Sequence, residues 1–170
     1  MNRKVILTVV GSDRPGLTRG LAEAVRAAGG NWLESHLARL GGRYVGSVLV
    51  ELPAERLGEL EAAARGIDAS GLKVAIVDAA ESDERTGQTL RIAIVGQDRP
   101  GIVHEVTTVL AGLDVNIEQL TSSIEGSAWS GAPLFRAEVT LLVPAHLSTD
   151  AVRDALEAIS NEIMVDFGSG

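Results

Sequence analysis

Gly11-Ser-Asp-Arg-Pro-Gly-Leu17 is the stretch that decides the fold, because it returns 85 residues later as Gly96-Gln-Asp-Arg-Pro-Gly-Ile102. The offset is half of the 170-residue chain, and it also places Asn31 on Asn116. A repeat of this kind indicates one structural unit present twice. The same offset relates two apolar sets with helical spacing, namely Leu17, Leu21, Ala24, Val25, Ala28 and Ile102, Val106, Val109, Leu110, Leu113.

Strand and helix patterns alternate within the first copy. Proline suits the first helical position and glycine pairs suit helix ends and hairpin turns. The expected elements are a strand over 5–10, a helix from Pro15 to Gly29-Gly30, two strands over 31–40 and 44–52 around Gly41-Gly42, a helix beginning at Pro53 with Leu57, Leu60, Ala64 and Ile67 on one face, and a strand over 72–77.

The second copy repeats this order over 90–95, 100–113, 116–125, 134–143, 148–159 and 163–167, with six extra residues expected in the hairpin around 127–133. The order β-α-β-β-α-β predicts an α+β chain of two ferredoxin-like domains, each an antiparallel four-stranded sheet covered by two helices. We expect domains over 1–80 and 89–170 and a polar linker over 81–88. Because small domains with open sheet edges associate readily, we expect the two halves to pair.

Composition excludes several classes of protein. The chain has no cysteine, which rules out disulfides, iron–sulfur clusters and thiolate zinc sites. A net charge of −8 argues against direct nucleic-acid binding. The six-residue apolar run Val5–Val10 is too short for a signal peptide or a membrane span. These features predict a cytoplasmic protein that does not bind membranes.

The repeated loop, between a strand and a helix, has two possible roles. Amides at a helix N-terminus suit a carboxylate, Gly16 and Gly101 permit close approach, and Asn31 and Asn116 would form an opposing wall. A carboxylate site beside polar groups fits an amino acid. Alternatively, Asp13 and Asp98 only cap the helices, Arg14 and Arg99 are surface charges or salt-bridge partners, and the asparagines are turn residues.

Catalytic patterns are missing. The glycine spacing of the loop has the phosphate-loop form, but Leu17-Thr18 and Ile102-Val103 stand where that loop needs Lys-Ser/Thr. The histidines His36, His104 and His146 are isolated, without metal-site spacing. We therefore expect no enzyme activity, no metal and no cofactor. Trp32 follows Asn31 on the opposite face of its strand, which favours a core or interface role.

The two D-R-P-G loops, each followed by a helix and an Asn-initiated strand, resemble a tandem ACT domain, and the layout is similar to the glycine cleavage system transcriptional repressor family. The resemblance covers nearly the whole chain. It implies amino-acid binding between ACT units and coupling to an associated protein. The ligand-binding positions that it implies are Asp13, Arg14, Pro15, Gly16, Leu17 and Asn31, with Asp98, Arg99, Pro100, Gly101, Ile102 and Asn116 in the second copy.

The resulting interpretation is a regulatory sensor of a small amino acid, with glycine or serine as first choices. It would control transcription through a protein partner, such as a DNA-binding transcription factor, and would form a homo-oligomer. The alternative is a ligand-independent interaction module, in which the loops are only helix caps and the sheet edges or the Trp129 segment recruit a partner.

Overall fold

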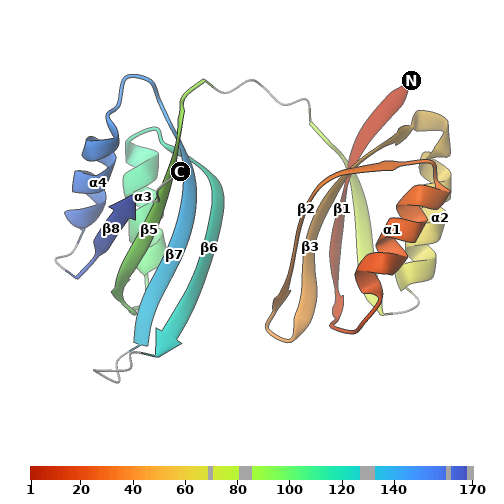
Figure 1. The fold of residues 1–170 in the computed structure, drawn as a ribbon, viewed down its shortest axis with the longest axis horizontal. Coiled ribbons are helices and arrows are strands. Elements are labelled where there is room, and N and C mark those ends of the chain that lie inside the picture. Colours follow the sequence, from red (N-terminus) through yellow and green to blue (C-terminus); the bar gives the residue numbers. More distant parts are fainter. Residues whose placement is uncertain (69–70, 81–85, 127–132, 160–161, 168–170) are drawn as a thin grey trace. The chain divides into compact units, whose positions relative to one another are not determined.

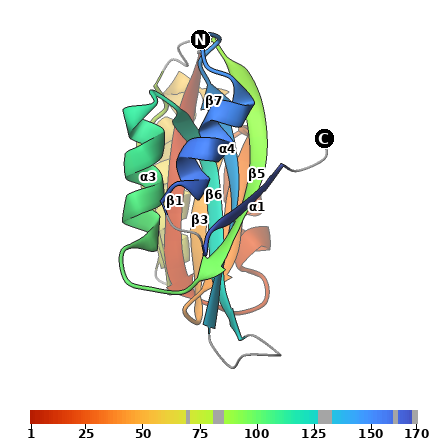
Figure 2. The same ribbon diagram turned by 90° about the vertical axis from the view of Figure 1, so that its left-hand side faces the viewer.

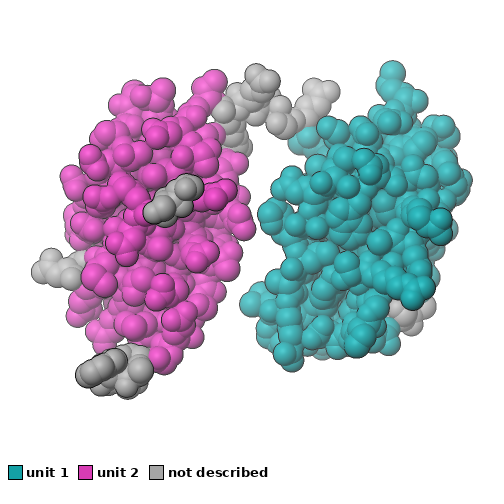
Figure 3. Space-filling model, viewed as in Figure 1, with its two compact units in different colours: residues 1–82 teal, residues 83–170 magenta. Residues whose placement is uncertain are grey.

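The computed structural model describes residues 1–68, 71–80, 86–126, 133–159 and 162–167. The chain divides into two compact units, residues 1–82 and 83–170 (Figure 3). The expected linker over 81–88 lies largely outside the described residues, and its last residue, Gln88, already begins a strand. The expected pairing of the two halves stays a prediction.

Unit 1 is an antiparallel four-stranded sheet in the order β2-β3-β1-β4, with α1 and α2 on one face (Figure 1). This is the predicted ferredoxin-like arrangement. Its elements are β1 (Asn2–Ser12), α1 (Leu17–Ala27), β2 (Asn31–Leu40), β3 (Arg43–Pro53), the short 3-10 helix η1 (Ala54–Arg56), α2 (Leu57–Asp68) and β4 (Leu72–Asp78).

Unit 2 repeats the topology with the order β6-β7-β5-β8. Figure 2 shows α3 and α4 lying over the same face of its sheet. The elements are β5 (Gln88–Gln97), α3 (Ile102–Gly112), β6 (Asn116–Gly126), β7 (Pro133–Val143), α4 (Thr149–Glu157) and β8 (Met164–Phe167). The predicted hairpin extension, Trp129 included, falls on 127–132, outside the described residues.

The helices begin later than the prolines predict. Pro15 and Pro100 lie in the turn before α1 and α3, and Gly16 and Gly101 are the N-cap residues, with φ of 93° and 92°. This left-handed conformation is strained for residues with a Cβ, so the glycine rather than the proline sets the helix start. Pro53 likewise ends β3 instead of starting α2, and η1 intervenes.

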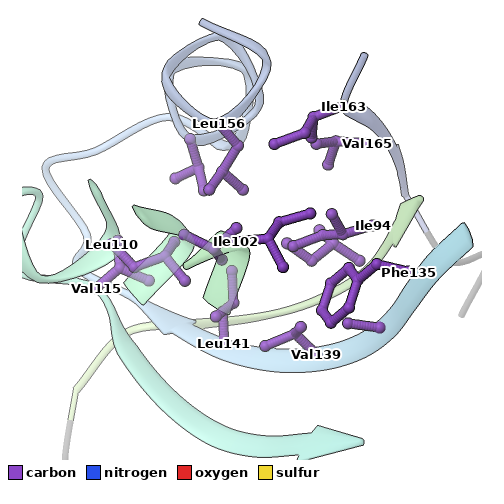
Figure 4. Packing of buried hydrophobic residues seen from close by; sticks show 14 of the residues in the cluster. Ile94, Ile102, Leu110, Val115, Phe135, Val139, Leu141, Leu156, Ile163 and Val165 are labelled. Atoms are coloured by element: carbon purple, nitrogen blue, oxygen red, sulfur yellow. The ribbon is translucent and has the colours of Figure 1, made fainter. Parts of the chain in front are cut away.

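Each unit has its own core between sheet and helices. Along β1, Val5, Leu7 and Val9 are buried while intervening residues face outward, as the period of a strand requires. In unit 2, Ile94, Leu110 and Leu141 are fully buried members of one core cluster, and Figure 4 shows them together with Leu156 of α4. Trp32 packs against the core of unit 1, which agrees with the predicted core role.

The outer strands β2 and β6 are largely exposed along one edge of each sheet. Both carry a register shift near their start, between Trp32 and Glu34 and between Ile117 and Gln119. The duplication therefore extends to a bulge that reorients the same part of the edge strand in each unit.

Candidate functional site

The repeated loop of unit 2 lies at the end of the sheet where β5 and β7 meet the last residues of β6. In the register, Gly96 lies opposite Phe135, and Phe135 lies opposite Ile124. The loop after β5 thus faces the end of the edge strand across a short gap. A groove of about 480 Å³ occupies it, lined by Asp98, Arg99, Gly101, Ile102, Val103, Ser122, Ser123, Ile124 and Phe135.

The N-terminus of α3 opens on this groove without a capping side chain. Gly101 is the N-cap residue and no side chain accepts a hydrogen bond from the first turn there; the same holds at Gly16 of unit 1. The expected capping role of Asp13 and Asp98 is therefore wrong, because the turn places the N-cap three residues beyond each aspartate. In unit 2 the amide of Ile102 donates to the carbonyl of Arg99 at 3.4 Å, and the next amides of the first turn are left as donors with a partial positive charge.

Space is available beside these amides. A Cβ added at Gly101 would meet nothing within 4 Å. An anion can therefore approach the backbone of the loop directly, as at other helix N-termini that bind carboxylates.

Arg99 is committed to Glu105 one turn into α3. Its Nη1 and Nη2 donate to Oε1 and Oε2 at 2.7 and 2.5 Å. These hydrogen bonds lower the pKa of Glu105 and raise that of Arg99. The interpretation of Arg99 as a salt-bridge partner is thus confirmed, and its charge is balanced within the unit.

Asp98 is different. It is half-buried in the wall of the groove, and within the described part of the chain its carboxylate has no ion-pair partner. The groove therefore combines the uncapped N-terminus of α3, an unpaired carboxylate, the polar residues Ser122 and Ser123, and the apolar residues Ile124 and Phe135. Such a set suits a small zwitterion whose carboxylate meets the amides and whose ammonium meets Asp98.

The equivalent place in unit 1 is bridged by side chains. Asp13 Oδ2 lies 3.0 Å from Arg39 Nε, which joins the loop to the end of β2. Tyr44 Oη lies 2.6 Å from Thr18 Oγ1, which joins β3 to the first turn of α1. Arg14 forms no ion pair within the described residues, in agreement with a surface charge.

Asn31 and Asn116 do not face the loops of their own units. Asn31 lies opposite Glu51, whereas Gly11 and Arg39, at the loop end, both lie opposite Tyr44. Asn116 lies opposite Leu142 and donates a hydrogen bond to Glu118. The expectation that they form the opposing wall is wrong within one unit, because the crossover helix returns the chain to the far end of the sheet before β2 or β6 begins.

The residues that do form the wall, from Ser122 to Ile124 together with Phe135, were missed in the sequence. The predicted topology itself contained the signal. In a split β-α-β unit the edge strand runs parallel to the first strand, so its last residues, not its first, border the loop.

Among the described residues, no group of three His, Cys, Asp or Glu side chains is placed to hold a metal ion. His36 pairs with Glu34 on exposed β2, at 3.0 Å. In the part of the chain that the structure describes, no helix is long and apolar enough to span a membrane.

Comparison with known proteins agrees with the two-unit fold. ACT-domain models match residues 3–76 and 90–161. A crystal structure of an unknown protein from Galdieria sulphuraria matches with a TM-score of 0.79 at 26% identity, over 98% of each chain. A crystal structure of a proposed glycine cleavage system transcriptional repressor matches in fold, with a TM-score of 0.73 at 16% identity, over 100% of this chain and 99% of that one. No curated protein sequence matches the chain.

Proposed function

The chain belongs to the ACT-domain family, and we propose that it is a regulatory sensor that binds a small amino acid and controls transcription through a protein partner. The observation that carries the ligand half of this proposal is the groove of unit 2, where uncapped amides of α3 and the unpaired carboxylate of Asp98 face the same space. The two groups complement the opposite charges of an amino acid.

The proposed ligand contacts in unit 2 are Asp98, Gly101, Ile102 and the end of β6, which line the groove, together with Pro100 of the same loop. Arg99 is held in place by Glu105. Glycine and serine are the first candidates, because the chain shares its fold with the proposed glycine cleavage system transcriptional repressor. The loop Asp13–Leu17 is the corresponding proposal in unit 1. Asn31 and Asn116 belong to the ligand set only if another ACT unit, such as one of a second copy, presents them.

The transcription half of the proposal rests on the fold shared with the proposed glycine cleavage repressor and on the acidic charge of the chain. A net charge of −8 disfavours direct contact with phosphates, so the effect on promoters would pass through a partner. Ligand binding would act by population shift, limited by the difference in affinity between two states of the protein.

Thermal unfolding against a panel of the common amino acids at millimolar concentration tests the sensor half. A ligand at ~100 times its dissociation constant stabilises the folded state by about 2.7 kcal/mol, which is readily seen as a rise in Tm. We expect glycine or serine to raise Tm. If no amino acid does so, the ligand-independent interaction module replaces this proposal.

A matched pair of variants locates the effect. Gly101→Asn and Gly16→Asn act at N-caps with nearly equal φ, and asparagine tolerates the left-handed region best among residues with a Cβ. Both variants should fold with similar small losses of stability. Gly101→Asn should abolish the ligand-induced rise in Tm, and an unchanged rise in both variants would contradict the assignment of the loops.

Transcription is tested separately by deleting the gene and measuring glycine cleavage transcripts with and without added glycine. We expect these transcripts to rise in the deletion strain, and we expect the purified protein alone not to retard promoter DNA. Unchanged transcripts would remove the transcriptional role while leaving ligand sensing intact.

A further inference from the structure

The repeat allows the two loop sites to be compared position by position. The sheet registers pair Tyr44 with Gly11 and Phe135 with Gly96, so the two aromatic residues are equivalent. Arg39 and Ile124 lie opposite these aromatics and are equivalent in turn. Thr18 and Val103 occupy the same position of the first helical turn, one residue after Leu17 and Ile102.

In unit 1 these positions hold groups that bond across the gap. The guanidinium of Arg39 reaches the carboxylate of Asp13, and the hydroxyl of Tyr44 reaches that of Thr18. The two links join the loop and the first turn of α1 to β2 and β3, the strands that correspond to β6 and β7 of unit 2. A ligand that binds between the loop and these strands would compete with both links.

In unit 2 neither link can form. Ile124 has no charge to offer Asp98, and Phe135 and Val103 have no hydroxyl. Ile124 is instead 63% exposed and Val103 41%, so apolar residues border the groove on two sides. Substitutions at three positions thus leave one site open and bridge the other.

The charged groups beside the two loops also differ between the units. In unit 1 the cation of Arg39 lies where the ammonium of an amino acid would approach Asp13. In unit 2 the carboxylate of Asp98 has no ion-pair partner among the described residues, while the charge of Arg99 is balanced by Glu105. A zwitterion therefore gains a charge partner at Asp98 but must compete with Arg39 at Asp13.

We propose that the two ACT sites of this chain are not equivalent: the groove beside Asp98 is the amino-acid site, and Arg39 and Tyr44 close its counterpart beside Asp13. Arg39 acts as an internal substitute for the ammonium of the ligand. This inference rests on the proposed function and specifies which loop carries it.

Isothermal titration of the full chain with glycine and with L-serine tests the proposal. We expect one site per chain. Replacing unit 1 residues by their unit 2 equivalents, in Arg39→Ile/Tyr44→Phe, should add a second site, because both links are lost. The single variant Arg39→Ile removes the competing cation at an exposed position and serves if the double variant folds poorly.

The reciprocal substitution Ile124→Arg places a guanidinium opposite Asp98 at an exposed position that the fold tolerates. It should weaken binding of the same amino acid by ~10-fold or more, equivalent to about 1.4 kcal/mol. Unliganded Tm of each variant is the control for folding.

The outcomes separate the two proposals. Two equal sites in the unaltered chain, or binding abolished by Gly16→Asn and unaffected by Gly101→Asn, would overturn the asymmetry while leaving a sensor. Absence of binding by glycine, L-serine and the rest of the amino-acid panel would overturn both. One site that Ile124→Arg weakens and Arg39→Ile/Tyr44→Phe duplicates would support the asymmetry.

Discussion

The hydroxyl of Tyr44 lies 2.6 Å from Oγ1 of Thr18, and this contact connects β3 to the first turn of α1. The ring of Tyr44 packs against the core of unit 1, while Phe135 occupies the equivalent place in unit 2 without a hydroxyl. Each ACT unit thus has an aromatic ring at this position, and unit 1 adds a polar link to it.

Tyr44→Phe should therefore cost less than about 1 kcal/mol in the free energy of unfolding, since it removes one partly exposed hydrogen bond and keeps the ring. Urea denaturation measures the cost. Tyr44→Ala is the comparison, and loss of the half-buried ring should cost more. If Tyr44→Phe were as harmful as Tyr44→Ala, the hydroxyl rather than the ring would hold this corner.

Gly46→Ala should be strongly destabilising. A Cβ at Gly46 would lie 1.9 Å from the carbonyl oxygen of His36 on neighbouring β2, and φ is already 148°. Backbone atoms cannot move aside as a flexible side chain can, so we expect a loss above about 2 kcal/mol or failure to fold. Urea denaturation and expression yield measure it.

Gly20→Ala is the control for Gly46→Ala. Gly20 lies inside α1, and nothing lies within 4 Å of its added Cβ. Replacing a helical glycine by alanine should stabilise by roughly 0.5–1 kcal/mol. Equal effects of the two variants would show that β2 does not approach β3 as closely as the structure has it.

Acid should destabilise the protein partly through Glu105. Hydrogen bonds from Arg99 lower the pKa of Glu105 below its ordinary 4.5. The unfolded chain therefore binds more protons than the folded one in this range, and the stabilisation, present above pH 4.5, is lost as pH falls through the folded pKa. Asp78 behaves alike, because Arg3 lowers its pKa.

Glu105→Gln should accordingly flatten the decline of unfolding free energy below pH 4.5, and Asp78→Asn should flatten it below pH 3.8, the ordinary pKa of an aspartate. Urea titrations between neutral pH and the acid range measure both. An unchanged acid dependence in the two variants would mean that these pairs do not persist in solution.

The sequence predicted the fold well because the repeat and the periodicities are properties of single elements. The strand and helix order and the two four-stranded sheets are confirmed, down to the hairpin at Gly41-Gly42. The predicted helix starts were wrong by two residues, because Pro15 was expected to be the first helical residue. Residue preferences for helix do not reveal that the backbone turns left-handed at Gly16.

The site was predicted only in part, because it depends on which elements meet. The loop could be found in the sequence because it is repeated. Ser122 and Ile124 belong to no recognisable motif, and only the register of β6 brings them to the same groove as Asp98. The pairs Asp13 with Arg39 and Arg99 with Glu105 likewise depend on side-chain directions that the sequence does not contain.

Asp98→Asn should weaken glycine binding by ~10-fold or more, because it removes the charge that faces the ligand ammonium and keeps the size of the side chain. The loss should be specific to binding, since the Asp98 carboxylate makes no ion pair among the described residues and Tm without ligand should barely change.

Asp13→Asn is the matched control for Asp98→Asn. It breaks the exposed pair with Arg39, at a cost below about 1 kcal/mol in stability, and should leave the affinity for glycine unchanged. Titration calorimetry and thermal unfolding of both variants separate these effects. Equal losses of affinity would mean that both loops contact the ligand, and a lower affinity in Asp13→Asn alone would move the site to unit 1.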